Sequence, residues 1–196
     1  MIDADSVWLD LNNFVLDGSA AGPATQTEGI VTDGHRNITV RNGEVRGFFN
    51  GVRLFTDMDG ANYRVENIRA DANTVTGIAI FGTGNGQHVI RNNVVADTGG
   101  SAVPGYVFAY AIQLSGAGNV VNNEVLHAFG DASQGGFGTA FVLDVGTQIA
   151  SGNRVSGADV AFQCFSAGKY LRDNVVVVTT RAYDPLCTLV GLTNYP

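Results

Sequence analysis

The stretch IRNNVV at residues 90–95 decides the fold, because close variants of it recur along the whole chain. Each copy joins two short apolar runs through one or two Asn or other turn-forming residues. The other copies are LNNFVL at 11–16, VRNGEV at 40–45, VENIRA at 65–70, VVNNEV at 120–125, ASGNRV at 150–155 and LRDNVV at 171–176. The 196 residues are therefore built from a degenerate repeat of roughly 20 to 30 residues.

Each copy ends on an apolar anchor and is followed by a second apolar alternation. The anchors are Leu16, Val45, Ala70, Val95, Val125, Val155 and Val176. The alternations are GIVT at 29, GVRLF at 51, GIAIF at 77, AIQL at 111, AFVL at 140, AFQCF at 161 and TLV at 188. Each unit thus offers three strands of about three to five residues, with connections too short for a helical crossover.

Strands of this length must stack on the next unit, so the pattern predicts an all-β, right-handed parallel β-helix of about seven coils. We expect one domain over residues 1–196 and almost no helix, since 26 Gly and abundant Asn and Asp suit tight turns. Ile2 falls where the alternation of a preceding coil would lie. We therefore expect a β-helix that lacks an N-terminal cap or coil.

Recurring Asn residues predict an asparagine ladder, in which each side-chain amide donates to the carbonyl of the next. The proposed members are Asn13, Asn42, Asn67, Asn92, Asn93, Asn123, Asn153 and Asn174. The Asn pairs at 92/93 and 122/123 leave the register open by one residue. The alternative is that Asn only tolerates left-handed turns, and both explanations can hold together.

Charge and hydropathy exclude several classes of partner. The net charge is −7, and ten Arg and the single Lys169 form no contiguous basic patch, so we expect no nucleic acid. No apolar run approaches the roughly 18 residues of a membrane span, so we expect no membrane partner. Cys164 and Cys187 lie 23 residues apart, close to one repeat; they either form a disulfide between coils or are two small buried residues.

Through strings such as NITVRNGEV at 37–45 and GIAIF at 77–81, the sequence resembles the pectate-lyase-like superfamily of right-handed parallel β-helix proteins. Its opening, IDADSVWLDLNNFVLDG, is similar to periplasmic β-helix repeat proteins like the accessory protein of nitrous oxide reductase maturation. The resemblance implies a carbohydrate-active protein outside the cytoplasm, extracellular or periplasmic. It suggests a lyase or epimerase acting on a uronate-containing glycan, although the fold also hosts non-catalytic binding and assembly modules.

In that superfamily, substrates lie along the sheet that follows the longest loops, here the Gly-Ile strand set. Alternation directs Ile30, Val52, Ile78, Ile112, Phe141 and Phe162 inward, and Val31, Arg53, Ala79, Gln113, Val142 and Gln163 outward. Long loops at 97–110 and 126–139 overhang this row. We expect a glycan or other small-molecule ligand to bind here.

The enzyme hypothesis needs a base, an acid and charge stabilisation. The candidate catalytic residues are Arg53, Tyr110, His127 and Asp144, and the candidate substrate-binding residues are Phe55, Phe81, Tyr106, Gln113 and Gln163. Arg53 would hold a uronate carboxylate, with Tyr110 or His127 as the base. The structural alternatives are an Arg53 paired with Asp57, tyrosines that pack a loop, and a surface histidine.

Two further hypotheses remain open. No cofactor is required, but calcium could bind where aspartates gather at the turns of the first coils, namely Asp3, Asp5, Asp33, Asp57 and Asp59. Turn chemistry explains the same aspartates without a metal. Alternatively, an outward strip of Val31, Val142, Val190, Phe55, Phe81 and Phe165 would support a homo-oligomer or another non-catalytic assembly.

Overall fold

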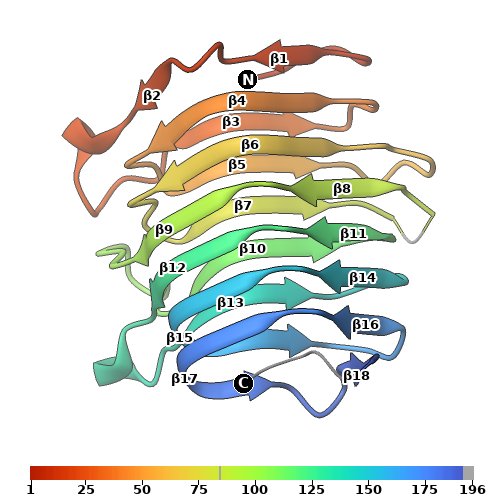
Figure 1. Cartoon of the computed structure of the whole chain (residues 1–196). Helices are drawn as coiled ribbons and strands as arrows, with labels where there is room; N and C mark the ends of the chain where they lie inside the picture. Colours follow the sequence, from red (N-terminus) through yellow and green to blue (C-terminus); the bar gives the residue numbers. More distant parts are fainter. Residues whose placement is uncertain (84, 192–196) are drawn as a thin grey trace.

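The computed structural model describes residues 1–83 and 85–191, and it is a right-handed parallel β-helix (Figure 1). Every strand pairing within that part of the chain is parallel. Helix is confined to two single turns, η1 (Ser19–Ala21) and η2 (Ala132–Gln134). No helix among the described residues is long and apolar enough to cross a membrane.

The strands stack in three faces, as the repeat predicts. Face 1 contains β3 (Glu28–Asp33), β5 (Asn50–Phe55), β7 (Thr76–Phe81), β10 (Ala109–Ser115), β13 (Gly138–Leu143) and the second parts of β15 (Arg154–Cys164) and β17 (Val175–Tyr183). Face 2 contains β1 (Trp8–Asp10), the first parts of β4 (Thr39–Arg46) and β6 (Arg64–Asp71), and then β8 (His88–Arg91), β11 (Gly118–Val121), β14 (Gln148–Ser151), β16 (Lys169–Arg172) and β18 (Thr188–Leu189). Face 3 contains β2 (Val15–Asp17), β9 (Val94–Gly99), β12 (Glu124–Phe129) and the remaining parts of β4, β6, β15 and β17.

The predicted register of the seven anchors and of the six inward residues of face 1 is confirmed. The seven anchors align in one unbroken column of Cα partners, from Leu16 on β2 to Val176 on β17. The six residues predicted to face inward on face 1 form a second column and are all buried. In that column the rings of Phe141 and Phe162 stack with centroids 4.7 Å apart. Burial of these columns in successive coils forms the apolar core.

The asparagine ladder is present, and it contains four of the eight proposed residues. Asn93 Nδ2 donates to Asn123 Oδ1 at 3.0 Å, Asn123 Nδ2 to Asn153 at 3.0 Å, and Asn153 Nδ2 to Asn174 at 2.9 Å. All four are buried. Each Nδ2 also donates to a backbone carbonyl: Asn93 to Val65 O, Asn123 to Ile90 O, Asn153 to Val120 O and Asn174 to Ala150 O.

The other proposed members occupy the preceding position, so placing all eight in one column is wrong. Asn42, Asn67 and Asn92 have φ angles of 57°, 53° and 56°, in the left-handed region that Asn tolerates. They lie on the outside, where Asn67 Nδ2 donates to Asn42 Oδ1 at 3.2 Å. Both explanations of the asparagines therefore hold, each for its own column.

Two predictions about face 1 are wrong. The segment TLV at 188 belongs to face 2, where β18 pairs with β16, and the seventh strand of face 1 is instead the end of β17 at Arg181–Tyr183. Val142 and Ala79 were predicted to be outward residues on the surface, but each is only 1% exposed. An outward position on the strand is therefore not an exposed one for either residue. The proposed apolar assembly strip is consequently interrupted.

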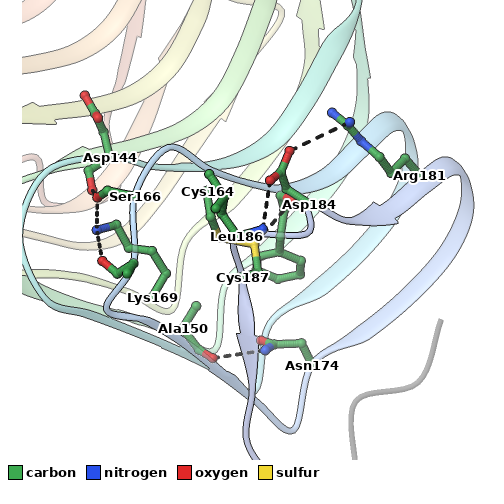
Figure 2. Close-up of a disulfide and its surroundings, with 12 residues drawn as sticks. Asp144, Ala150, Cys164, Ser166, Lys169, Asn174, Arg181, Asp184, Leu186 and Cys187 are labelled. Atoms are coloured by element: carbon green, nitrogen blue, oxygen red, sulfur yellow. Dashed lines mark hydrogen bonds and ion pairs between the residues drawn. A yellow bond between two sulfur atoms is a disulfide. The ribbon is translucent and has the colours of Figure 1, made fainter.

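Cys164 and Cys187 form a disulfide with a Cα–Cα distance of 5.4 Å (Figure 2). It joins the end of β15 to the turn before β18, and so ties the last coil to the preceding one. The same close-up shows Lys169, whose ammonium donates to Gly146 O at 2.6 Å, Ser166 Oγ at 2.9 Å and Ala167 O at 3.2 Å.

Lys169 is one of three polar side chains that fill the turns leading from face 1 to face 2. Lys169, Gln148 and His88 are fully buried, and they lie in one column of partners that also includes Gly118. Gln148 Nε2 donates to three turn carbonyls, from Leu114, Gly116 and Val145. The column satisfies backbone groups that the tight turns would otherwise leave unpaired in the interior.

Candidate functional site

A groove of about 520 Å³ lies on face 1 over β5, β7 and β10, beneath the loop between β9 and β10. Its lining combines aromatic rings with a few polar groups, the usual composition of a small-molecule site. The lining residues are Glu28, Phe49, Asn50, Arg53, Val75, Thr76, Phe81, Gly105, Tyr106, Phe108, Tyr110 and Gln113. Five of the nine predicted site residues therefore meet in this groove: Arg53, Phe81, Tyr106, Tyr110 and Gln113.

Glu28 is the functional group that the sequence reasoning missed. Its Oε2 lies 3.5 Å from Arg53 Nη1, and its Oε1 accepts a hydrogen bond from Asn50 Nδ2 at 3.0 Å. The two charged side chains are about one quarter exposed, at 24% for Glu28 and 29% for Arg53. Arg53 therefore pairs with Glu28 on the neighbouring coil, and the predicted pairing with Asp57 is wrong.

Two successive inward positions, Gly29 and Ile30, explain why Glu28 points outward at the start of β3. Strict alternation from the buried Ile30 would direct Glu28 into the core. Gly29 interrupts that alternation: a Cβ atom there would lie 2.6 Å from Val45 Cγ1 and 2.5 Å from Gly51 O, so Gly29 itself faces the interior. Two successive inward positions reverse the alternation, and Glu28 lies outside in register with Asn50.

The aromatic wall of the groove is held by ring contacts. Tyr106 packs edge-to-face against Phe49 with centroids 4.7 Å apart, and Phe108 packs in the same way against Phe137 at 4.9 Å. Tyr106 and Phe108 nevertheless stay 48% and 36% exposed. Contacts of this geometry fix the loop over β10 and leave ring faces available to a ligand.

Arg53 is positioned from a second side by Phe55, a predicted substrate-binding residue. The guanidinium carbon of Arg53 lies 5.7 Å from the centre of the Phe55 ring, within the range of a cation–π contact. Phe55 does not line the groove itself. It acts on the groove through Arg53, as one of the two groups that hold the guanidinium.

Tyr110 lines the groove from β10, in register with Thr76 and Thr139. Burial raises the pKa of its phenol above the usual value of 10.0. The neutral phenol is therefore the form present near neutral pH, suited to hydrogen bonding and poorly suited to accepting a proton.

The structure does not bring His127 to this groove. His127 lies on β12 of face 3, where its Nδ1 is 3.1 Å from Asp97 Oδ1 and its ring stacks on Phe129 at 5.9 Å. It borders a different groove, with Ser156 and Asp159. A residue in the third strand of a coil points away from a ligand on the first face, so His127 and Arg53 cannot act on one bond.

Asp144 and Gln163 are on the correct face but lie farther along the stack. Gln163 is two coils from Gln113 in the same column, a separation of about 10 Å at the usual strand spacing. It accepts a hydrogen bond from Thr139 Oγ1 at 3.3 Å. Asp144 follows β13 and lies above Ser166, near Lys169 (Figure 2). Neither lines the groove.

Two of the five aspartates proposed for calcium, Asp3 and Asp5, have other partners at the first coils. His35 lies between two of them, with Nε2 3.1 Å from Asp3 and Nδ1 3.3 Å from Asp5. Asp5 also accepts the backbone N–H of Arg36 at 2.9 Å. Within residues 1–83 and 85–191, no three His, Cys, Asp or Glu side chains are grouped so that they could hold one metal ion.

No family model, curated protein or solved structure matches this chain. The geometry of the groove is therefore the basis for assigning a function to this chain.

Proposed function

We propose that this protein binds a carbohydrate chain in the groove over β5, β7 and β10. The observation that carries the proposal is the combination, in one concave site, of exposed aromatic rings with polar groups held by their neighbours. Sugars present apolar C–H faces that stack on aromatic rings and hydroxyl groups that both donate and accept hydrogen bonds. Rings such as Tyr106 and Phe81 supply the first contact, and Arg53, Asn50 and Gln113 supply the second.

Membership in the pectate-lyase-like superfamily and an extracellular or periplasmic location are part of the same proposal. The parallel three-faced stack with its internal asparagine ladder supports the first. The Cys164–Cys187 disulfide supports the second, because disulfides persist in oxidising compartments and are rare in the cytosol.

Binding is tested by isothermal titration and by NMR against a panel of neutral and acidic oligosaccharides. We expect at least one glycan to bind, and Tyr106→Ala to weaken that binding at least tenfold through loss of a stacked ring. Tyr170→Ala is the matched control, since Tyr170 is similarly exposed, at 41%, but lies on β16 of face 2. Equal losses in the two variants, or no binding across the panel, would refute the proposal.

A second candidate, β-elimination on a uronate, is favoured by the presence of Arg53 and Tyr110 in the same groove. The base would remove the proton on the carbon next to the carboxylate, the glycosidic C–O bond would break, and a C=C bond would form. The departing sugar oxygen takes up a proton. The base in this reaction is the Tyr110 phenolate. Burial raises the pKa of Tyr110, so the fraction of phenolate is small at neutral pH and increases as the pH rises.

The lyase candidate predicts new ultraviolet absorbance from unsaturated uronates, with a rate that rises from pH 7 to pH 10. Tyr110→Phe would abolish this absorbance while leaving glycan binding within a few-fold of the original. Absence of absorbance on polygalacturonate and alginate, with and without calcium, would leave the protein as a binding module.

A further inference from the structure

We infer that the groove selects an uncharged glycan over a uronate, and that Glu28 is the residue that determines this specificity. The inference rests on the proposed carbohydrate-binding function. It departs from the expectation that Arg53 holds a substrate carboxylate, because the structure shows that a carboxylate of the protein already occupies that place.

Glu28 is held in position from two sides. Asn50, its Cα partner on the next strand, donates to Oε1 at 3.0 Å, and Arg53 approaches Oε2 at 3.5 Å. Both carboxylate oxygens are thus engaged in a site that is three quarters shielded from solvent. A partly buried ion pair is screened less by water and salt than a surface pair, so the charge of Arg53 is largely compensated before a ligand arrives.

No second cation is present to receive an acidic sugar. Of the residues that line the groove, Arg53 is the only one with a basic side chain. The chain as a whole carries a net charge of −7, so its long-range field also repels a polyanion. A uronate entering the groove would place its carboxylate beside Glu28, and like charges in a partly desolvated site oppose binding.

The same pair suits sugar hydroxyls. A carboxylate accepts hydrogen bonds, and a guanidinium has five N–H donors, of which one is directed at Glu28. A fixed acceptor beside a fixed donor can bind two adjacent hydroxyl groups, while Tyr106 or Phe81 contacts the ring face. Recognition of this kind requires no charge on the ligand.

The test compares affinities for neutral and acidic hexasaccharides by isothermal titration at low salt. The probes are cellohexaose, xylohexaose and mannohexaose against hexagalacturonate. The protein should bind at least one neutral hexasaccharide at least tenfold more tightly than the uronate. Glu28→Gln keeps the shape and an acceptor for Asn50 but removes the charge, so this ratio should fall by at least tenfold.

Glu124→Gln is the matched control. Glu124 lies on β12 of face 3, 43% exposed and 3.7 Å from Arg154, so its loss lowers the net negative charge by the same amount outside the groove. The ratio should stay within about twofold of the original in this variant.

The outcomes separate the inference from the function on which it rests. If the unaltered protein binds hexagalacturonate as tightly as the neutral sugars, or if Glu28→Gln and Glu124→Gln change the ratio equally, the inference is overturned and carbohydrate binding stands. If no glycan binds any of the three proteins, the proposed function fails and the inference fails with it. Should Glu28→Gln not fold, the preference of the unaltered protein decides alone.

Discussion

Replacing Asn123 by Ala removes the second member of the buried ladder and tests how much of the fold depends on it. Asn123 accepts from the backbone N–H and the side-chain Nδ2 of Asn93, both at 3.0 Å. It donates to Ile90 O at 3.0 Å and to Asn153 Oδ1 at 3.0 Å. Asn153 Oδ1 keeps one partner in the variant, because the backbone N–H of residue 123 also donates to it, at 2.9 Å.

The substitution therefore leaves two groups without a partner in the interior: the backbone N–H and one amide hydrogen of Asn93. Leaving a buried polar group unsatisfied costs about 1–3 kcal/mol, so the two together predict a loss of about 2–6 kcal/mol. Single domains are stable by only about 5–15 kcal/mol. We expect Asn123→Ala to be severely destabilised or unfolded at 37 °C.

Urea unfolding followed by circular dichroism at pH 7.5 measures this loss. Asn62→Ala is the matched control: the Asn62 amide donates to Asn37 at 3.2 Å and accepts from Gln87 N at 3.3 Å, but the residue is exposed. Water replaces those partners, so the control should lose at most about 1 kcal/mol. Losses that agree within about 1 kcal/mol would show that burial of the ladder does not govern its contribution.

Three further predictions concern buried groups near the turns and the last coil. Burial lowers the pKa of His88 from 6.5 to about 4. As the pH falls below 6.5, the unfolded chain takes up a proton on this histidine while the folded chain does not. The free energy of unfolding should therefore be highest above pH 6.5 and lower by about 2 kcal/mol at pH 5. Urea midpoints at pH 7.5 and 5 measure this loss, and they are best compared in a His35→Asn background. Hydrogen bonding to Asp3 raises the pKa of His35, so protonation of His35 stabilises the folded chain at low pH and would offset the effect of His88. Midpoints that do not change would contradict a neutral buried His88. Reducing the Cys164–Cys187 disulfide, which closes a separation of 23 residues, should cost about 3 kcal/mol, and a Cys164→Ser variant should then be insensitive to reductant. Lys169→Met leaves two turn carbonyls without a donor and should cost about 2–4 kcal/mol in the same assay, whereas an unchanged midpoint would show that the turn relaxes to reach water.

Much of the architecture could be predicted from the sequence, because the repeat specifies it coil by coil. The anchors from Leu16 to Val176 and the inward column from Ile30 to Phe162 align as their spacing indicates. A side chain in a parallel stack meets its equivalent in the next coil, so a pattern seen in one dimension translates directly into contacts. The same reasoning found the ladder from Asn93 to Asn174, but it could not separate that column from its neighbour one residue earlier.

The candidate site depended on features that the repeat does not encode. Glu28 reaches the groove because Gly29 faces inward, against Val45, and reverses the alternation. His127 is separated from Arg53 because the two belong to different faces of the coil, and Val142 is buried although its strand position faces outward. Sequence alone thus determined which residues stack and which form the core, since those choices repeat locally with each coil. Only the tertiary structure decided which outward side chains share one groove, because that depends on strand bends and on a loop that occurs once.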